Sequence, residues 1–270
     1  MSRKPRGDFQ RLNAMNIQAG QIKPGEFPTD RFVAFIDILG FRDLIGRMFS
    51  DEPSLFTTLL NALELTKGMA GHVDPQNVRA VTAFSDSVVI SEGGPFGTAG
   101  VLATVMVLAG ELLKKGILCR GGIAVGRTYH ANGVVFGEGL LRAYDLERTV
   151  ANTARIVVDD HVAPSIFFLI DDPIPHLKRD QDGRLVVNVF NYFWEAAEIE
   201  TQKGDVGEYL PGAVDVVGLS QARQGLEAAL RRARSVGRTD IVEKVVWIIN
   251  EFNETIDAFP DIQIPPIDVE

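Results

Sequence analysis

Two short apolar runs, each interrupted by one aspartate, stand out in the pattern of hydrophobic and polar positions. The first run, Arg31 to Phe41, reads RFVAFIDILGF and is apolar on both faces of a strand. A strand of this kind is buried on both sides, so an ionised Asp37 within it needs a positive partner. The second run, Ala80 to Ile90, carries Asp86 as its only acid. Neither aspartate has a basic residue near it in its own run, so the pattern predicts two buried strands whose aspartates share a divalent cation.

The pattern along the rest of the first 160 residues alternates strands and helices. It predicts strands at 31–38, 78–84, 86–92, 117–126, 134–136 and 154–158, and helices from Phe41, at 54–69, 98–115 and 138–150. This order is that of a ferredoxin-like core, so the fold class is α+β. Such a core has one open face. Because the strands are apolar on both faces, we expect a second subunit to cover that face.

Three regions follow from this assignment. Residues 1–29 are polar, contain Pro24 and Pro28, and are interpreted as a flexible N-terminal arm. Residues 30–160 form the predicted core. Residues 161–270 are interpreted as an elaboration of it, with a strand within 184–193 and two C-terminal helices at about 218–235 and 238–258.

Composition narrows the possible partners. The chain has 270 residues, 46% of them hydrophobic and 23% charged, and a net charge of −9. That acidity argues against general nucleic-acid binding, but a bound metal could still attract a small anionic ligand. Cys119 is the only cysteine, which fits a reducing cytoplasm. No run reaches the ~18 apolar residues that span a membrane, and the basic N-terminus lacks the apolar stretch of a secretory signal. We therefore expect a cytoplasmic protein with no nucleic-acid or membrane partner.

Four segments, taken in order, resemble the catalytic domain of class III nucleotidyl cyclases. They are RFVAFIDILGFRDLI, AFSDSVVIS, RGGIAVG and VVFGEGLLRAYDLE, and they cover about residues 31–160. The combination FIDILGF, FSDS and RAYDLE is most similar to the bacterial pyrimidine cyclases of Pycsar antiphage defence. The resemblance implies a palm-type, ferredoxin-like cyclase core with C-terminal helical additions.

The resemblance also implies a metal and triphosphate site. Asp37 and Asp86 match the two metal-binding carboxylates, and Ile38 matches the residue whose carbonyl also binds metal. Leu39, Gly40 and Phe41 match the loop whose amides hold the triphosphate. All-oxygen ligands suit two Mg²⁺ or Mn²⁺ ions per active site.

The chain departs from the family at the remaining functional positions. The Asn and Arg of the transition-state pair fall on Leu141 and Asp145, which cannot do that work, and Arg142 or Arg148 is the candidate substitute. The base-reading Lys of an adenylate cyclase falls near Arg79 or Ala80. Its partner Asp falls on Val134, so the hydrogen-bond pattern that reads adenine is missing. This favours a pyrimidine base.

The function implied is the cyclisation of UTP, or else CTP, to a 3′,5′-cyclic nucleotide with release of pyrophosphate. The family builds its active sites between two protomers, so a homodimer with shared sites is implied. A separate effector chain would sense the product. A purine cyclase and a degenerate nucleotide-binding domain are the alternatives; FSDS in place of GGDEF argues against a diguanylate cyclase.

Simpler interpretations exist for each candidate residue. Asp37 could cap the helix that begins after Gly40, and Asp86 could be an ordinary hairpin-turn residue. The adjacent glycines at 121–122 could mark a bulge or a close approach. Arg120, Arg142 and Arg148 could be surface cations.

Overall fold

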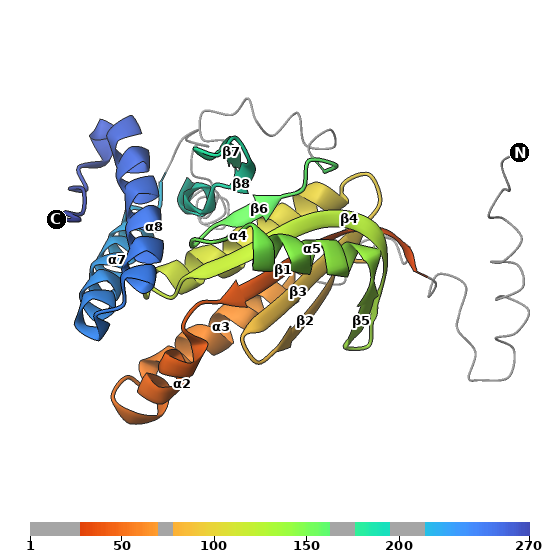
Figure 1. The fold of residues 1–270 in the computed structure, drawn as a ribbon, viewed down its shortest axis with the longest axis horizontal. Coiled ribbons are helices and arrows are strands. Elements are labelled where there is room, and N and C mark those ends of the chain that lie inside the picture. Colours follow the sequence, from red (N-terminus) through yellow and green to blue (C-terminus); the bar gives the residue numbers. More distant parts are fainter. Residues whose placement is uncertain (1–27, 70–77, 163–175, 195–213) are drawn as a thin grey trace, which may run out of the picture.

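The computed structural model describes residues 28–69, 78–162, 176–194 and 214–270. One mixed sheet runs through these residues in the order β2-β3-β1-β4-β6-β8-β7, with β5 paired to β4 (Figure 1). Its strands are β1 (Thr29–Ile38), β2 (Ala80–Phe84), β3 (Ser87–Gly93), β4 (Cys119–Ala131), β5 (Val134–Gly137), β6 (Ile156–Val158), β7 (Leu177–Arg179) and β8 (Leu185–Val187). The helices are α2 (Phe41–Ser50), α3 (Ser54–Gly68), α4 (Gly97–Leu113), α5 (Glu138–Thr149), α7 (Val216–Val236) and α8 (Thr239–Ala258).

The first four strands form the predicted ferredoxin-like core. Strand β1 lies between β3 and β4 and is antiparallel to both, and β2 pairs with β3 at the edge. Helices α2 and α3 connect β1 to β2, and α4 connects β3 to β4. This split arrangement, with each pair of parallel strands separated by an antiparallel one, confirms the predicted α+β fold.

Both faces of β1 are buried, as its apolar pattern predicts. Ala34, Ile36 and Ile38 enter the main core with α3 and α4, whereas Val33 and Phe35 pack on the other face with Ala143 of α5. Figure 1 shows α5 lying across β1 and β4. The expectation that this face is open is therefore wrong over these two strands, because the helix that follows β5 returns to cover them.

Several element boundaries differ from the prediction. Strand β1 begins at Thr29, inside the segment interpreted as an arm; residues 1–27 lie outside the described residues. Strand β4 continues to Ala131 because its second half pairs with β5. The predicted strand at 184–193 is only β8, followed by a 3-10 helix (η3, Val189–Asn191). That helix turns Phe190 into the core, where its ring centroid lies 5.7 Å from that of Phe252.

The two C-terminal helices are present as predicted. The carboxylate of Asp215 caps α7 by accepting a hydrogen bond from the amide of Gly218 at 2.8 Å, and α7 ends at Gly237 in the left-handed conformation. Buried residues of α7 and α8, including Leu226 and Ile249, join the main core. Within the described residues, no helix is long and apolar enough to cross a membrane.

Candidate active site

Asp37 and Asp86 meet at one end of the sheet. Asp37 is the penultimate residue of β1, where it pairs with Ser87 of β3 on one side and with Arg120 of β4 on the other. The amide of the next residue, Ile38, donates a hydrogen bond to the carbonyl oxygen of Asp86 at 2.8 Å. The turn that carries Asp86 is thus held against the end of β1.

Asp86 lies in a turn and not in a strand, which corrects one expectation. Phe84 pairs with Ser87, so Ser85 and Asp86 form a two-residue hairpin loop. Ser85 has a φ of 53°, a left-handed conformation that tight hairpins require. Asp86 is consequently half-buried, as is Asp37 on the neighbouring strand.

The segment after Asp37 leads directly into α2. Gly40 is the N-cap residue with a φ of 68°, and no side chain in the described part of the chain caps the helix. The hypothesis that Asp37 caps this helix is therefore wrong. The amide of Leu39 donates to the carbonyl of Leu118 at 2.8 Å, so it is not available to a phosphate group. The amide of Phe41, in the first turn, has no acceptor within the helix.

The positive partner that Asp37 needs is Arg120. The Nε–H of Arg120 donates to Oδ2 of Asp37 at 3.1 Å, and the same Nε atom lies 2.6 Å from Oε1 of Glu147 on α5. The side chains of Arg120 and Glu147 are 28% and 5% exposed. Arg120 is thus not a free surface cation but lies between two carboxylates at the site.

Glu147 is a third acid at this end of the sheet. Burial raises the pKa of its carboxyl, and so do the nearby charges of Asp37 and Asp86, while Arg120 and Arg148 oppose the increase. Cys119, beside Arg120, is also affected: burial and then the charge of Asp37 raise the pKa of its thiol to about 12. This end of the sheet therefore brings three acids, Asp37, Asp86 and Glu147, close enough to act on one another.

The two glycines after Arg120 allow a close approach and do not form a bulge. The register between β1 and β4 continues without interruption through Gly121 and Gly122. A Cβ atom at Gly121 would lie 2.6 Å from the carbonyl oxygen of Phe35, so this position tolerates only glycine in the present packing. Gly122 likewise allows a close approach, here of the α5 backbone at Ala143. This contact brings Glu147 over Arg120.

Comparisons with known proteins find similarity at the level of solved structures only. No family model matches the chain, and no curated protein matches it. The catalytic core of a rhodopsin-guanylyl cyclase with converted specificity, in complex with ATPαS, is 16% identical with a TM-score of 0.42 over 60% of this chain and 96% of that one. An adenylate/guanylate cyclase/hydrolase from Silicibacter pomeroyi is 15% identical with a TM-score of 0.34, over 59% of this chain and 95% of its own. A bacterial light-regulated adenylyl cyclase is 15% identical with a TM-score of 0.38, over 66% of this chain and 56% of that chain.

The two predicted arginines of α5 both lie on the exposed side of the helix. Arg142 donates to the carbonyl oxygen of Val125 at 3.3 Å. Arg148 lies over the ring of Tyr144, with its guanidinium carbon 6.0 Å from the ring centroid. Arg148 is the nearer of the two in electrostatic terms, since its charge acts on Glu147.

Arg79 and Val134 lie at the opposite ends of their strands from the aspartates. Arg79 precedes β2 and forms an ion pair with the buried Glu92, with 2.5 Å between Nε and Oε2. Val134 begins β5, beside Ala131 at the far end of β4 from Arg120, and is 52% exposed. Within one chain, these two residues are not brought to Asp37 and Asp86.

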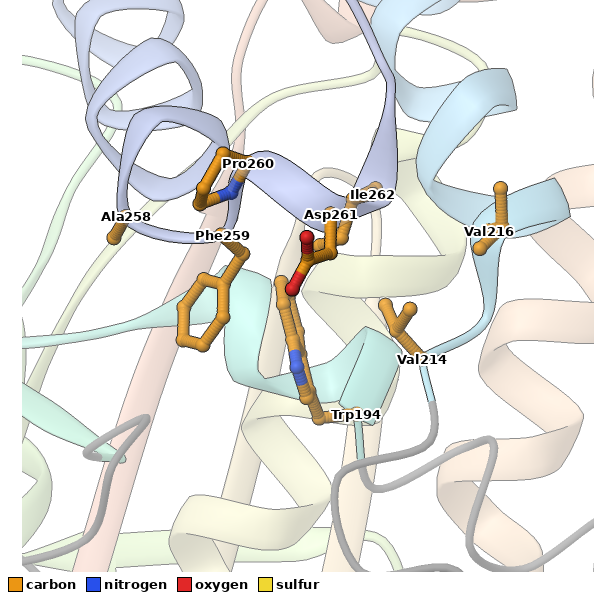
Figure 2. A pocket seen from close by; sticks show the side chains of 8 residues that line it. All are labelled: Trp194, Val214, Val216, Ala258, Phe259, Pro260, Asp261 and Ile262. Atoms are coloured by element: carbon orange, nitrogen blue, oxygen red, sulfur yellow. The ribbon is translucent and has the colours of Figure 1, made fainter.

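A cavity of about 350 Å³ lies elsewhere, between the C-terminal end of α8 and the start of α7 (Figure 2). Figure 2 shows the ring of Trp194 and the carboxylate of Asp261 in its lining, with mostly apolar side chains around them. None of the predicted site residues lines this cavity.

Glu147 is not among the residues predicted from the sequence, and Arg120 is interpreted there as a surface cation. A signal for Glu147 was present: it follows Ala143 by four residues, and so lies on the same inward face of α5. An acid on the buried stripe of a helix needs a partner as much as one in a buried strand does.

Proposed function

We propose that the chain is a nucleotidyl cyclase that forms a 3′,5′-cyclic pyrimidine nucleotide and releases pyrophosphate. UTP is the preferred substrate and CTP the next. The observation that carries the proposal is the hydrogen bond from the amide of Ile38 to the carbonyl of Asp86, which places two aspartates at one end of the sheet beside the start of α2.

The residues at this end suit a hard divalent cation. Asp37 and Asp86 offer carboxylate oxygens, and Ile38 offers its carbonyl, a donor set that favours Mg²⁺ or Mn²⁺. In the described ranges no three His, Cys, Asp or Glu side chains are placed to hold a metal ion together, so triphosphate and water would complete the coordination. Two bound ions would lower the pKa of the ribose 3′-hydroxyl and neutralise the charge of the leaving pyrophosphate.

The chain itself would bind and orient the triphosphate. The left-handed Gly40 turns the backbone so that α2 begins immediately after the metal strand. The first-turn amides of α2, beginning with Phe41, point out of the helix, where they favour an anion. Holding the nucleotide between this turn and the aspartates would align the 3′-hydroxyl with the α-phosphate, and such positioning carries much of the rate in phosphoryl transfer.

A shared site between two copies of the chain explains where Arg79 and Val134 lie. These residues are distant from Asp37 within one chain, so they would contribute to the site of a partner protomer. Large apolar side chains are exposed on α5, on β5 and at the end of β2: Phe84, Val134, Phe136, Leu141 and Tyr144, each between 41% and 63% exposed. Exposed apolar side chains are candidates for an interaction surface, and in a shared-site dimer a second copy would cover some of them.

The preference for a pyrimidine base rests on the missing hydrogen-bonding groups that would read adenine. Val134 cannot hydrogen-bond to adenine through its side chain, and Arg79 is engaged by Glu92. The role of the product as a second messenger in antiphage defence, read by an effector on another chain, follows from the resemblance described above.

A nucleotide-binding domain without catalytic activity is the second candidate. Two observations favour it: Arg120 already neutralises Asp37, and the transition-state positions hold Leu141 and Asp145. A degenerate domain of this kind would bind nucleotide without turning it over.

The test is to incubate the purified chain with each of the four NTPs and Mn²⁺ and to look for cyclic products. The Asp37→Ala, Asp86→Ala double variant removes both carboxylates, and an Asp240→Ala, Asp257→Ala variant removes two exposed acids elsewhere as a matched control. Cyclic product from UTP or CTP, lost only in the first variant, supports a pyrimidine cyclase. Product from ATP or GTP indicates a purine cyclase, and metal-dependent nucleotide binding without product indicates the degenerate domain.

A further inference from the structure

One N–H group of Arg120 faces two carboxylates. Its Nε–H donates to Oδ2 of Asp37 at 3.1 Å. Oε1 of Glu147 lies closer, at 2.6 Å from the same nitrogen. Yet within the described residues this oxygen is buried and has no hydrogen-bond partner. Since Nε carries a single hydrogen, it can serve only one of the two carboxylates at a time.

This arrangement leaves Oε1 of Glu147 without a hydrogen-bond donor. A buried carboxylate oxygen without a donor is costly, because it has lost its hydration and gained no hydrogen bond. Glu147 is 4% exposed, so bulk water does not supply the missing donor. Nε of Arg120, 2.6 Å from this oxygen, is a donor within reach, and its hydrogen now points at Asp37.

We propose that Arg120 is an exchangeable counter-ion. It pairs with Asp37 when no cation is bound, and it passes its Nε–H to Glu147 when a divalent cation takes Asp37. Glu147 is then a positioning residue: it holds Arg120 beside the site and gives it a second acceptor. This inference rests on the metal site proposed above.

The packing of α5 holds the second acceptor, Glu147, in place before any cation binds. Gly122 lets α5 lie directly on β4, so Glu147 is fixed above Arg120 by backbone contacts. Because the Nε atom is already within 2.6 Å of Oε1, the exchange requires a reorientation of the guanidinium and no movement of the helix. Arg120 remains paired in both states, so a cation that binds Asp37 does not have to drive a partly buried positive charge into water.

The exchange can be followed without measuring activity. In side-chain ¹H–¹⁵N spectra, the Nε–H of Arg120 exchanges slowly with water while it is hydrogen-bonded and rapidly when it has no acceptor. We would record it with and without saturating Mg²⁺ in the wild type and in Glu147→Met, which keeps the volume but removes the acceptor. The Nε–H of Arg31, which donates to Oγ of the buried Ser91 at 3.0 Å, is an internal reference that Mg²⁺ should not affect.

In the wild type we expect slow exchange in both conditions, together with a change in chemical shift on adding Mg²⁺. In Glu147→Met we expect slow exchange without Mg²⁺ and an exchange rate about tenfold or more higher with it, as for loss of a charge-assisted hydrogen bond. Rapid exchange in the Mg²⁺-bound wild type would overturn the proposal, and so would slow exchange in the Mg²⁺-bound Glu147→Met variant.

Calorimetry with Mg²⁺ separates this inference from the proposed function. If the wild type binds no Mg²⁺, or if Asp37→Asn, Asp86→Asn binds it as tightly, the metal site and the exchange both fail. If binding needs both aspartates but the Arg120 signal is unchanged by Mg²⁺, only the exchange fails.

Discussion

Gly122 of β4 and Ala143 of α5 lie so close together that no side chain fits between them. A Cβ atom at Gly122 would lie 2.3 Å from the carbonyl oxygen of Ala143 and 2.6 Å from Cβ of Leu146. The helix therefore rests on the strand backbone. Glu147, one turn beyond Ala143, is placed over Arg120 by this contact.

Gly122→Ala is expected to push α5 away from the sheet. The cost is about 1–3 kcal/mol of unfolding free energy, typical of overpacking, because the obstructing atoms belong to a helix backbone. Urea denaturation measures it. The matched control is Gly46→Ala in α2, where nothing lies within 4 Å of the added methyl group; it should be neutral or stabilising by about 0.5–1 kcal/mol. Equal stability of Gly122→Ala and the wild type would show that α5 moves without cost.

The sequence predicts the strand that carries Asp37 because a short, nearly continuous apolar run that ends at a glycine is typical of a strand buried on both faces. It also offers a hairpin turn as the simpler interpretation of Asp86, since Ser-Asp-Ser between two apolar runs is a turn signal, and the structure confirms this alternative over a buried strand. The order of elements then limits the topology to a small set, and the ferredoxin-like core follows.

The sequence does not predict the partner of Asp37. Arg120 is 83 positions away in the chain, and their contact depends on the register of β1 against β4, which no local pattern specifies. The glycines after Arg120 were ambiguous for a related reason: a bulge and a close approach both require glycine, and only the docked position of α5 distinguishes them. The spacing from Ala143 marks Glu147 as inward-facing, but its contact with Arg120 is set only by that same docking.

Arg120→Met is expected to destabilise the metal-free protein. It leaves Glu147 and Asp37 without their shared cation, and removing one partner of a buried ion pair costs about 3–5 kcal/mol, less where the group is partly exposed as Arg120 is. Adding Glu147→Met should restore much of the loss, because an apolar pair replaces a charged one. Unfolding free energies from urea titrations of both variants test this. Arg142→Met, at an exposed arginine on α5, should change little; if it costs as much as Arg120→Met, the effect is not specific to the ion pair.

His130 is expected to make the protein sensitive to acid. Its Nδ1 lies 2.8 Å from Oγ of Ser91 and its Nε2 lies 2.9 Å from Oγ1 of Thr82, so the ring joins β4 to β3 and β2. Burial, and then the charge of Arg31, lower the pKa of His130 from 6.5 to about 4. Below the ordinary pKa, the unfolded chain binds a proton that the folded chain does not. Stability is therefore lost as the pH falls from 6.5 towards 4, by up to about 3 kcal/mol.

The measurement is the unfolding free energy at about pH 7 and about pH 4.5. His130→Gln keeps hydrogen-bonding groups but cannot titrate, so the difference between the two pH values should shrink. His161→Gln, at an exposed position, is the control and should leave the difference as in the wild type. A His130→Gln variant with the full wild-type difference would assign the acid sensitivity to other groups.

Phe136→Glu is expected to prevent the proposed dimer from forming. Phe136 is 55% exposed on β5, where it stacks on Tyr129 with ring centroids 5.2 Å apart. A charge there cannot be buried against a second copy without a large desolvation cost. Sedimentation velocity should show a dimer for the wild type and a monomer for this variant, while Phe49→Glu, on α2 at 78% exposure, should remain a dimer.

The monomeric variant should still bind Mg²⁺, because Asp37 and Asp86 belong to one chain. It should form no cyclic product, because Arg79 and Val134 would come from the partner. Full activity in a demonstrated monomer would show that the site is complete within one chain.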